Sequence, residues 1–478
     1  MSLTSTPADF PTDELNDPYA SVWLELWRIE ADLNLFDRLI GNTAYWPILR
    51  AEAALGVANA LGLHQRIPAA IRARRVSRAA SSMHAALNGQ AFWLHSLRAD
   101  TVLIPSVRKC RNNGMLSDSH SDRLLADPDF GNFLVLDSHF SNSYYPETAT
   151  RAVRDWDGFR TWQRLIGGLT YRTLYAAAMT EHHLLDDHFR RHFARPFPLS
   201  AKTLAQRVAA FEHGRTAARR LLTKVGARRV VAVARITALD VIAAARDVGI
   251  PTIEIQHGAC SIYDALVHYP QRPFVDTAPD LFLTFSPYWN DMVTLPSQTK
   301  AVPVGAPISL AAAIPPVPAG TRKAVLLSQW TVDSRMFALA HEMAARAPDW
   351  RFVFRPHPSS DTARYQRAVR AQGPAYSNLT VSDPDTDIAD ELADAEVQIG
   401  VYSTSLFEGM TLGTRTIVIA FPGHAYMNQA LKDGDACLAS DAESAVAMLP
   451  RAPTCRNRLR YFSLPTPSLL NVINSVCN

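Results

Sequence analysis

The sequence predicts an α/β protein in which two doubly wound parallel sheets follow an N-terminal helical extension. Short apolar runs alternate with helix-like stretches from residue 229 to residue 450, a pattern typical of parallel strands joined by helices. Residues 19–98 carry helical periodicity instead. A length of 478 residues accommodates two or three domains of ordinary size.

The extension is expected to contain at least two helices separated by a Trp-Pro element. The apolar face of the first helix recurs at spacings of four and three and comprises Val22, Leu26, Ile29, Leu33, Phe36 and Ile40. Residues 42–47 then break the pattern with Pro47, and a second helix rich in Ala and Leu begins at Ile48.

The first sheet is expected within residues 100–270. Its predicted strands are residues 101–104, 133–136, 229–234 and 250–255. Residues 151–223 are mostly helical in pattern, and a helix over 238–248 ends at Gly249, a residue type that commonly terminates helices.

The second sheet is expected within residues 280–450 and is the more regular of the two. Its predicted strands are residues 281–285, 301–305, 323–327, 351–354, 397–401 and 416–420. Ligands of such sheets bind at the carboxyl ends of the strands, so the loops after the strands are where functional residues are sought.

The expected domain boundaries follow from these patterns. Residues 1–17 are expected to be disordered, residues 18–272 to form the N-terminal domain with its helical extension, and residues 273–455 to form the C-terminal domain. Residues 456–478 are expected to be a tail that packs back on the N-terminal domain.

Composition favours a cytoplasmic protein. A net charge of +3, from 48 basic and 45 acidic residues, argues against a dedicated nucleic-acid binder. The five cysteines are scattered without a CxxC pair, which indicates a reducing compartment and no zinc site. Neither a signal peptide nor a transmembrane run is expected. The basic clusters at residues 72–75 and 215–229 are interpreted as solvated helix faces. The alternative is a basic surface that faces anionic lipid or an anionic acceptor.

The most informative segment spans residues 397–413. A short apolar run meets three consecutive hydroxyl residues, Ser403, Thr404 and Ser405, before a helix-like stretch that contains Glu408. Hydroxyls and backbone N–H groups at such a strand-to-helix turn hold phosphate, although the same groups also cap the helix. Glu408 could accept hydrogen bonds from ribose hydroxyls or simply stabilise the helix start.

A second loop follows the strand over 351–354. It reads Arg355-Pro356-His357-Pro358, so two prolines stiffen a loop that presents Arg355 and His357. Arginine and histidine both suit phosphate oxygens, and the alternative for Arg355 is a local salt bridge.

A third loop, Glu254-Ile255-Gln256-His257-Gly258, ends a strand of the first sheet. His257 could point towards a ligand or hydrogen-bond the turn. Asp240, at the start of the next helix along from the 229–234 strand, could serve as a general base or nucleophile. Its alternative role is to stabilise the helix start.

Weaker signals remain. Arg108 and Arg111 follow the first strand and could contact an anionic acceptor. His182, His183 and His188 are interpreted as an exposed helix face, because their spacing with Asp186 and Asp187 matches no metal motif. No metal site is predicted, and no Walker, GxGxxG or GxSxG motif occurs.

The order Gln-His-Gly, Arg-Pro-His-Pro and Ser-Thr-Ser…Glu resembles GT-B glycosyltransferases of bacterial capsule and lipopolysaccharide assembly. It is most similar to enzymes that use cytidine-activated donors, namely CMP-Kdo and CMP-sialic acid transferases and CDP-glycerol glycerophosphotransferases. Residues 45–50 resemble a Trp-Pro-x-x-Arg element of surface-polysaccharide proteins. The resemblance implies a GT-B fold, in which two Rossmann-like domains face a cleft, over residues 230–425.

The implied activity is transfer of Kdo, or a related nonulosonic acid, from a CMP donor to a surface polysaccharide. His357 and residues 403–405 would then hold the donor phosphate. No cofactor is implied beyond the CMP-sugar substrate, and the partners would be that donor, a glycan or glycolipid acceptor and the inner face of the membrane or partner transferases. The acidic-acidic-Gly motif of the sialyltransferases is absent, so Asp240 or Glu254 would supply the carboxylate.

Three alternatives stay open at this point. A glycerophosphotransferase or a UDP-sugar enzyme of the same fold would use the same loops. A UDP-sugar 2-epimerase is a more distant possibility. A non-catalytic scaffold of this fold, which binds glycan or a partner transferase, belongs to another class.

Overall fold

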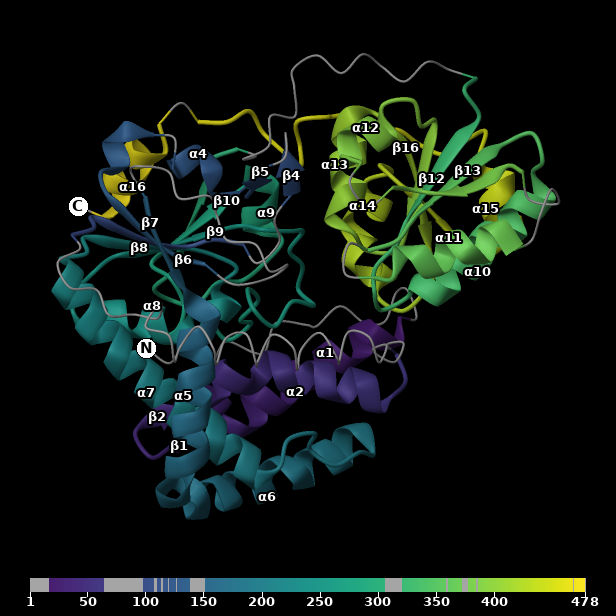
Figure 1. Ribbon diagram of the computed structural model, residues 1–478. Helices are drawn as coiled ribbons and strands as arrows, with labels where there is room; N and C mark the ends of the chain where they lie inside the picture. Colours follow the sequence, from purple (N-terminus) through teal and green to yellow (C-terminus); the bar gives the residue numbers. More distant parts are fainter. Residues whose placement is uncertain are drawn as a thin grey trace, which may run out of the picture. The chain divides into compact units, whose positions relative to one another are not determined.

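The computed structural model describes residues 17–63, 98–106, 110–112, 115–118, 120–125, 127–137, 151–305, 320–357, 360–371, 377–383, 386–466 and 468–477. The chain forms two compact units (Figure 1). The C-terminal unit comprises residues 1–33, 57–65 and 313–458, and the N-terminal unit comprises residues 34–56, 66–312 and 459–478.

The N-terminal unit is built on a parallel sheet of seven strands among its described residues, in the order β11-β10-β9-β8-β3-β6-β7. The strands are β3 (Thr101–Ile104), β6 (Phe133–Asp137), β7 (Arg151–Asp155), β8 (Arg229–Val233), β9 (Thr252–Ile255), β10 (Leu281–Thr284) and β11 (Lys300–Pro303). The chain starts in the middle of the sheet and reverses direction between β3 and β8, which makes this a topological switch point.

Helices cover both faces of this sheet because its side chains alternate. Val102 and Val230 pack with Leu222 of α7 (Ala201–Val225), whereas Leu103 and Val231 pack on the opposite face with residues of α16 (Leu469–Cys477). The other helices of this part of the chain are α2 (Trp46–Ala60), α4 (Asp122–Leu125), α5 (Trp156–Thr170), α6 (Tyr175–Phe193), α8 (Leu239–Asp247) and α9 (Pro287–Asp291). Two short antiparallel pairs add β1 (Leu39–Ile40) with β2 (Thr43–Ala44), and β4 (Cys110–Asn112) with β5 (Met115–Ser117).

The C-terminal unit contains a parallel sheet of six strands among its described residues, in the order β14-β13-β12-β15-β16-β17. They are β12 (Lys323–Leu327), β13 (Arg351–Arg355), β14 (Leu379–Val381), β15 (Val397–Gly400), β16 (Arg415–Ile419) and β17 (Cys437–Ala439). Its helices are α10 (Asp333–Arg346), α11 (Thr362–Ala371), α12 (Ile388–Leu392), α13 (Thr404–Leu412), α14 (Asn428–Lys432) and α15 (Ala442–Met448). This strand order is that of a Rossmann fold, with the switch point between β12 and β15.

The predicted fold class is therefore confirmed as two Rossmann-like parallel sheets with helical N-terminal segments. The assignment of residues 281–285 and 301–305 to the second sheet was wrong, because β10 pairs with β9 and β11 pairs with β10 in the N-terminal sheet. The face-to-face arrangement of the two domains stays a prediction. The search for membrane-spanning helices, which covered the described residues, finds none long and apolar enough to cross a bilayer.

The first helix, α1 (Pro18–Leu33), belongs to the C-terminal unit and not to the N-terminal domain, where the sequence placed it. The buried carboxylate of Asp17 explains this, because it accepts hydrogen bonds from the backbone N–H groups of Gly423 (3.0 Å) and Ala425 (2.9 Å) as well as Tyr19 (2.9 Å). Asp17 is thereby ordered at the edge of the segment expected to be disordered, and residues 1–16 lie outside the described residues.

The last residues cluster with the N-terminal unit. The backbone carbonyl of Tyr461 accepts from the indole N–H of Trp289 (2.7 Å), and that of Arg460 accepts from the hydroxyl of Ser286 (2.6 Å). These bonds satisfy buried donors on and beside α9, so residues 459–466 act as a strap across the carboxyl end of β10.

Asp17→Ala is expected to lower the free energy of unfolding by about 3 kcal/mol, because buried backbone N–H groups lose their acceptor. Urea denaturation monitored by tryptophan fluorescence measures this change, since Trp23 and Trp27 lie on α1. Asp32→Ala, an exposed position on the same helix, is the matched control and should change stability little. Equal effects of the two substitutions would contradict the anchoring role of Asp17.

Candidate functional site

The loops after β12 and β15 meet at the switch point of the C-terminal sheet. Thr331 Oγ1 lies 2.5 Å from the hydroxyl of Tyr402, which joins the two loops directly. Burial raises the pKa of Tyr402 to about 12, further above neutral pH than that of an ordinary tyrosine. The carboxyl edge of this sheet therefore has a fixed frame in the position where ligands bind in Rossmann folds.

The three hydroxyl residues predicted to hold phosphate lie at this edge. Ser403 caps α13, and its hydroxyl accepts from the backbone N–H of Ser405 at 3.2 Å. Ser403, Thr404 and Ser405 are each half-buried, whereas Glu408 is buried one turn into the helix. The capping role is thus observed, and the phosphate-binding role of these residues and of Glu408 stays a prediction.

Gln329, which the sequence did not single out, follows β12 at the same switch point. Its side chain is 8% exposed, and neither its amide oxygen nor its amide nitrogen has a hydrogen-bond partner among the described residues. An unsatisfied buried amide is costly, which makes Gln329 a candidate for contact with a polar ligand. The only sequence signal was its place directly after a strand.

Asp333 connects the loop after β12 with the loop after β13. The carboxylate is fully buried, accepts from the hydroxyl of Ser360, and is also hydrogen-bonded by Ser328 and the backbone of His357. Burial raises its pKa above the ordinary value, and these hydrogen bonds oppose the rise. The arrangement fixes the backbone of His357, whose side chain is half-buried.

The side chain of Arg355 is bound by residues of its own C-terminal unit. Its guanidinium donates to Ser382 Oγ (3.1 Å) and to the carbonyl of Thr386 (2.7 Å), and lies 3.8 Å from the carboxylate of Glu391. This is the local salt-bridge alternative considered from the sequence. Donor binding by Arg355 stays a prediction, but the observed contacts already account for its charge.

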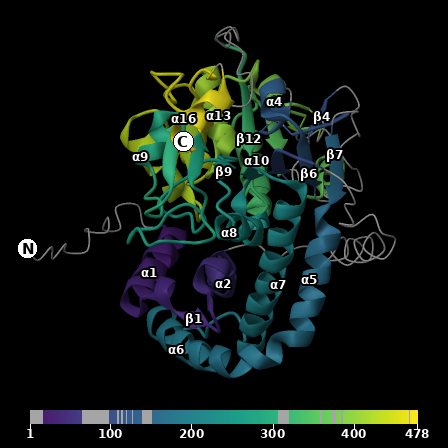
Figure 2. The ribbon, with the colours of Figure 1, turned by 90° about the vertical axis from the view of Figure 1, so that its left-hand side faces the viewer.

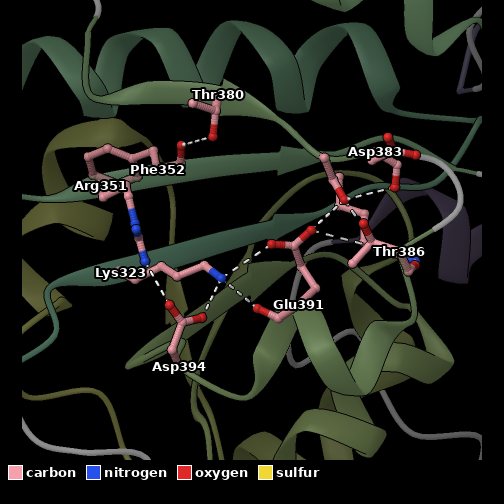
Figure 3. Close-up of polar contacts among 10 residues, drawn as sticks. Lys323, Arg351, Phe352, Thr380, Asp383, Thr386, Glu391 and Asp394 are labelled. Carbon is pink, nitrogen blue, oxygen red and sulfur yellow. Dashed lines mark hydrogen bonds and ion pairs between the residues drawn. The ribbon is translucent and has the colours of Figure 1, made fainter.

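Glu391 is the centre of a buried charge network (Figure 3). Lys323, at the start of β12, donates to the carbonyl of Glu391 (2.8 Å) and pairs with its carboxylate (3.3 Å) and with Asp394 (2.5 Å). Asp394 also pairs with Arg351 at 2.7 Å. Burial raises the pKa of Asp394, but the hydrogen bond and charge of Lys323, together with those of Arg351, outweigh this effect and lower that pKa. The network holds α12 against β12 and β13 and so supports the loop after β13.

In the N-terminal unit, an aspartate–histidine pair lies beside the switch-point strand β3. The buried carboxylate of Asp118 accepts from the backbone N–H of Ser106 (2.8 Å), which follows β3, and from Ser121 Oγ (2.7 Å). It also lies 3.3 Å from Nδ1 of His120, whose ring contacts Phe285 beyond β10. A carboxylate on Nδ1 orients an imidazole so that Nε2 can act as a base. Sequence reasoning missed this pair because it has no motif.

Glu254 occupies a structural position. It is 2% exposed and pairs at 3.0 Å with Arg235, which is 1% exposed and follows β8. Burial raises the pKa of Glu254, and the positive charge of Arg235 opposes that rise. The catalytic role of Glu254 stays a prediction that its ion pair disfavours.

The remaining predicted residues are placed as follows. His257 is exposed after β9, in a loop tied by Gln256, which accepts from the N–H of Phe285 and donates to the carbonyl of Gly258, both at 2.8 Å. Asp240 lies in the first turn of α8 against Gly214 of α7, and burial raises its pKa. Arg108 lies outside the described residues, as does the side chain of Arg111.

Metal ligands do not gather in the described part of the chain, where no group of three or more His, Cys, Asp or Glu side chains could hold an ion. The Trp-Pro-x-x-Arg element has an internal role instead. Arg50 is buried, donates to the carbonyls of Ala265 (2.7 Å) and His268 (3.0 Å), and stacks over Tyr269 at 4.2 Å. It therefore supports the long loop after β9.

No protein-family model and no curated protein matches the chain. Among solved structures, it is similar to the UDP-GlcNAc 2-epimerase of Methanocaldococcus jannaschii, with 10% identity, a TM-score of 0.43 and coverage of 78% of this chain and 99% of the other. For sucrose-phosphate synthase of Thermosynechococcus elongatus the identity is 12% and the TM-score 0.43, and the match covers 80% of this chain and 96% of the other. For MurG of Acinetobacter baumannii the identity is 14% and the TM-score 0.34, and the match covers 56% of this chain and 79% of the other. Because these TM-scores lie below 0.5, the fold is established by the strand order alone.

Glu391→Ala is expected to destabilise the protein by about 3 kcal/mol, because it leaves the buried Lys323 and the partly buried Arg355 short of compensating charge. Chemical denaturation of the full chain measures the effect. Glu342→Ala is the matched control, since Glu342 forms an exposed pair with Arg346 at 3.8 Å and such pairs contribute little. A loss as small as that of the control would contradict the role of Glu391.

Proposed function

We propose that the chain is a glycosyltransferase of GT-B type that binds a nucleotide-activated sugar in its C-terminal unit. The observation that carries the proposal is the Rossmann strand order of the C-terminal sheet, with Ser403, Thr404 and Ser405 at its switch point. Nucleotide phosphates bind at this place in such folds, where backbone N–H groups and hydroxyls face them.

The donor in this proposal is a CMP-activated Kdo or a related nonulosonic acid. The support is the resemblance of the Arg-Pro-His-Pro and Ser-Thr-Ser…Glu segments to transferases with cytidine-activated donors. A CMP leaving group carries one phosphate, whose developing charge could be stabilised by His357 and the hydroxyl cluster at residues 403–405. Gln329, whose amide has no hydrogen-bond partner in the part of the chain that the structure describes, adds a neutral donor and acceptor for a base or sugar hydroxyl.

The transfer step requires a base for the acceptor hydroxyl. We assign this role to His120, with Asp118 as the positioning residue on Nδ1. Nε2 of His120 takes the hydroxyl proton as the acceptor oxygen bonds to the anomeric carbon, and the bond from that carbon to the CMP phosphate oxygen breaks. Asp240, Glu254 and His257 are the competing candidates that the sequence predicts.

Nucleotide binding tests the donor site. Calorimetric titration of the full chain with CMP, CDP and UDP is expected to show binding, tightest for CMP. His357→Ala should weaken it about tenfold, because a hydrogen bond to a charged phosphate is lost. His183→Ala, an exposed histidine on α6, should leave the affinity unchanged. If UDP binds best, the cytidine assignment is wrong, and a CDP preference favours glycerophosphate transfer.

Turnover tests the base. His120→Gln is expected to lower kcat by about 10² or more while nucleotide affinity is retained. Asp118→Asn should lower kcat less and shift the pH profile, because the ring loses its orienting carboxylate. An unchanged kcat in His120→Gln, with a loss in Asp240→Asn, would assign the role to Asp240. Absence of binding to every nucleotide would favour the non-catalytic scaffold.

A further inference from the structure

An exposed apolar stripe runs along the outer face of α5 and continues beyond its end. Trp162, Leu165 and Leu169 recur at spacings of three and four, and their exposed fractions are 51%, 42% and 80%. Tyr175, at the start of α6, is also exposed. No other large apolar residue in the described part of the chain is as exposed as Leu169.

The packing of α5 explains why these side chains point outward. Gly167 lies against the backbone of α7 at Gln206 and Ala210, so closely that a Cβ there would come within 2.7 Å of the Ala210 nitrogen. That contact fixes the inner face of α5. Figures 1 and 2 both show α5 running away from the sheet and turning into α6 at the lower edge of its unit.

The surroundings of the stripe are basic. No acidic residue occurs between Asp157 and Glu181, whereas arginines stand at positions 160, 164 and 172. Lys202, exposed at the start of α7, lies 5.6 Å above the ring of Tyr171. Neither Arg172 nor Lys202 forms an ion pair within the described residues, so their charges face solvent.

We propose that this stripe, residues 162–175 with Lys202, docks the protein on an anionic lipid bilayer. A helix surface that combines exposed Trp, Tyr and Leu with Arg and Lys and lacks acidic residues matches the interfacial region of a membrane. The apolar side chains enter the acyl boundary, while the basic ones contact lipid phosphates. The occupant is a lipid surface because the exposed basic side chains of Arg164, Arg172 and Lys202 accompany the exposed apolar ones.

This inference goes beyond the proposed transferase activity and does not depend on it. The stripe lies on α5 and the turn after it, whereas the proposed base and donor groups lie at the carboxyl edges of the sheets. If the protein binds lipid but transfers no sugar, the membrane-docking proposal is supported and the proposed transferase activity is refuted.

Vesicle co-sedimentation of the full chain tests the proposal. The protein should bind phosphatidylcholine vesicles that contain phosphatidylglycerol, and bind more weakly to phosphatidylcholine alone or at high salt. Leu169→Asp should weaken binding about tenfold, because a charge replaces a leucine that enters the acyl boundary of the bilayer. Arg172→Gln should weaken binding to the anionic vesicles about fivefold and leave binding to the neutral ones unchanged.

Matched controls lie elsewhere on the surface. Leu464→Asp replaces a leucine that is 61% exposed, and Arg364→Gln replaces an exposed arginine on α11; both should bind as the unaltered protein does. Circular dichroism and light scattering establish folding and mass. The proposal is overturned if the unaltered protein binds neither vesicle, or if Leu169→Asp binds normally. It also fails if Leu169→Asp turns a dimer into a monomer, which would make the stripe a self-association surface.

Discussion

Every paired strand in the two large sheets runs parallel to its neighbour, and this constraint decides where chemistry can take place. Parallel strands require long crossovers, so each strand is followed by a loop at the same edge of its sheet. Since each sheet begins in its middle, the loops at the switch point diverge to opposite faces and leave room for a ligand. Thr331 and Tyr402, about seventy positions apart in the sequence, come into contact at this edge because β12 and β15 lie side by side.

Buried charge then fixes the loops that the sheets bring together. Removing charges from water is costly, so each such group persists only with partners that hold it in one geometry. Glu391 ties α12 to Lys323, Arg235 pairs with Glu254 under the loop after β9, and Asp17 anchors α1 on the loop after β16. Buried charged side chains with fixed partners therefore position the carboxyl edges of both sheets as well as the N-terminal helix α1.

Strand positions were accessible to sequence reasoning because a buried parallel strand is a short apolar run, as in β8 and β15. The hydroxyl cluster at residues 403–405 was found for the same reason, since it directly follows such a run. The pairing of α1 with the C-terminal unit was not accessible, because it rests on one carboxylate and two N–H groups about four hundred positions apart. Asp118 and His120 lacked any motif, and only the fold brings them beside Ser106.

Arg355 and Gln329 show why residue type alone misjudges a site. An arginine at the end of a strand predicts phosphate binding and an internal ion pair equally well, because both roles need the same charge. The decisive partner, Glu391, lies on the helix α12, more than thirty positions further along the chain. A glutamine after a strand predicts no particular role from the sequence. The buried amide of Gln329 nevertheless has no hydrogen-bond partner in the described part of the chain, which costs about 1–3 kcal/mol of desolvation free energy. A polar ligand that completed this amide would gain that energy on binding. In the proposed function, the donor phosphate is therefore held by neutral hydroxyls, an amide and one histidine more than by a fixed arginine, which would suit a leaving group with a single phosphate.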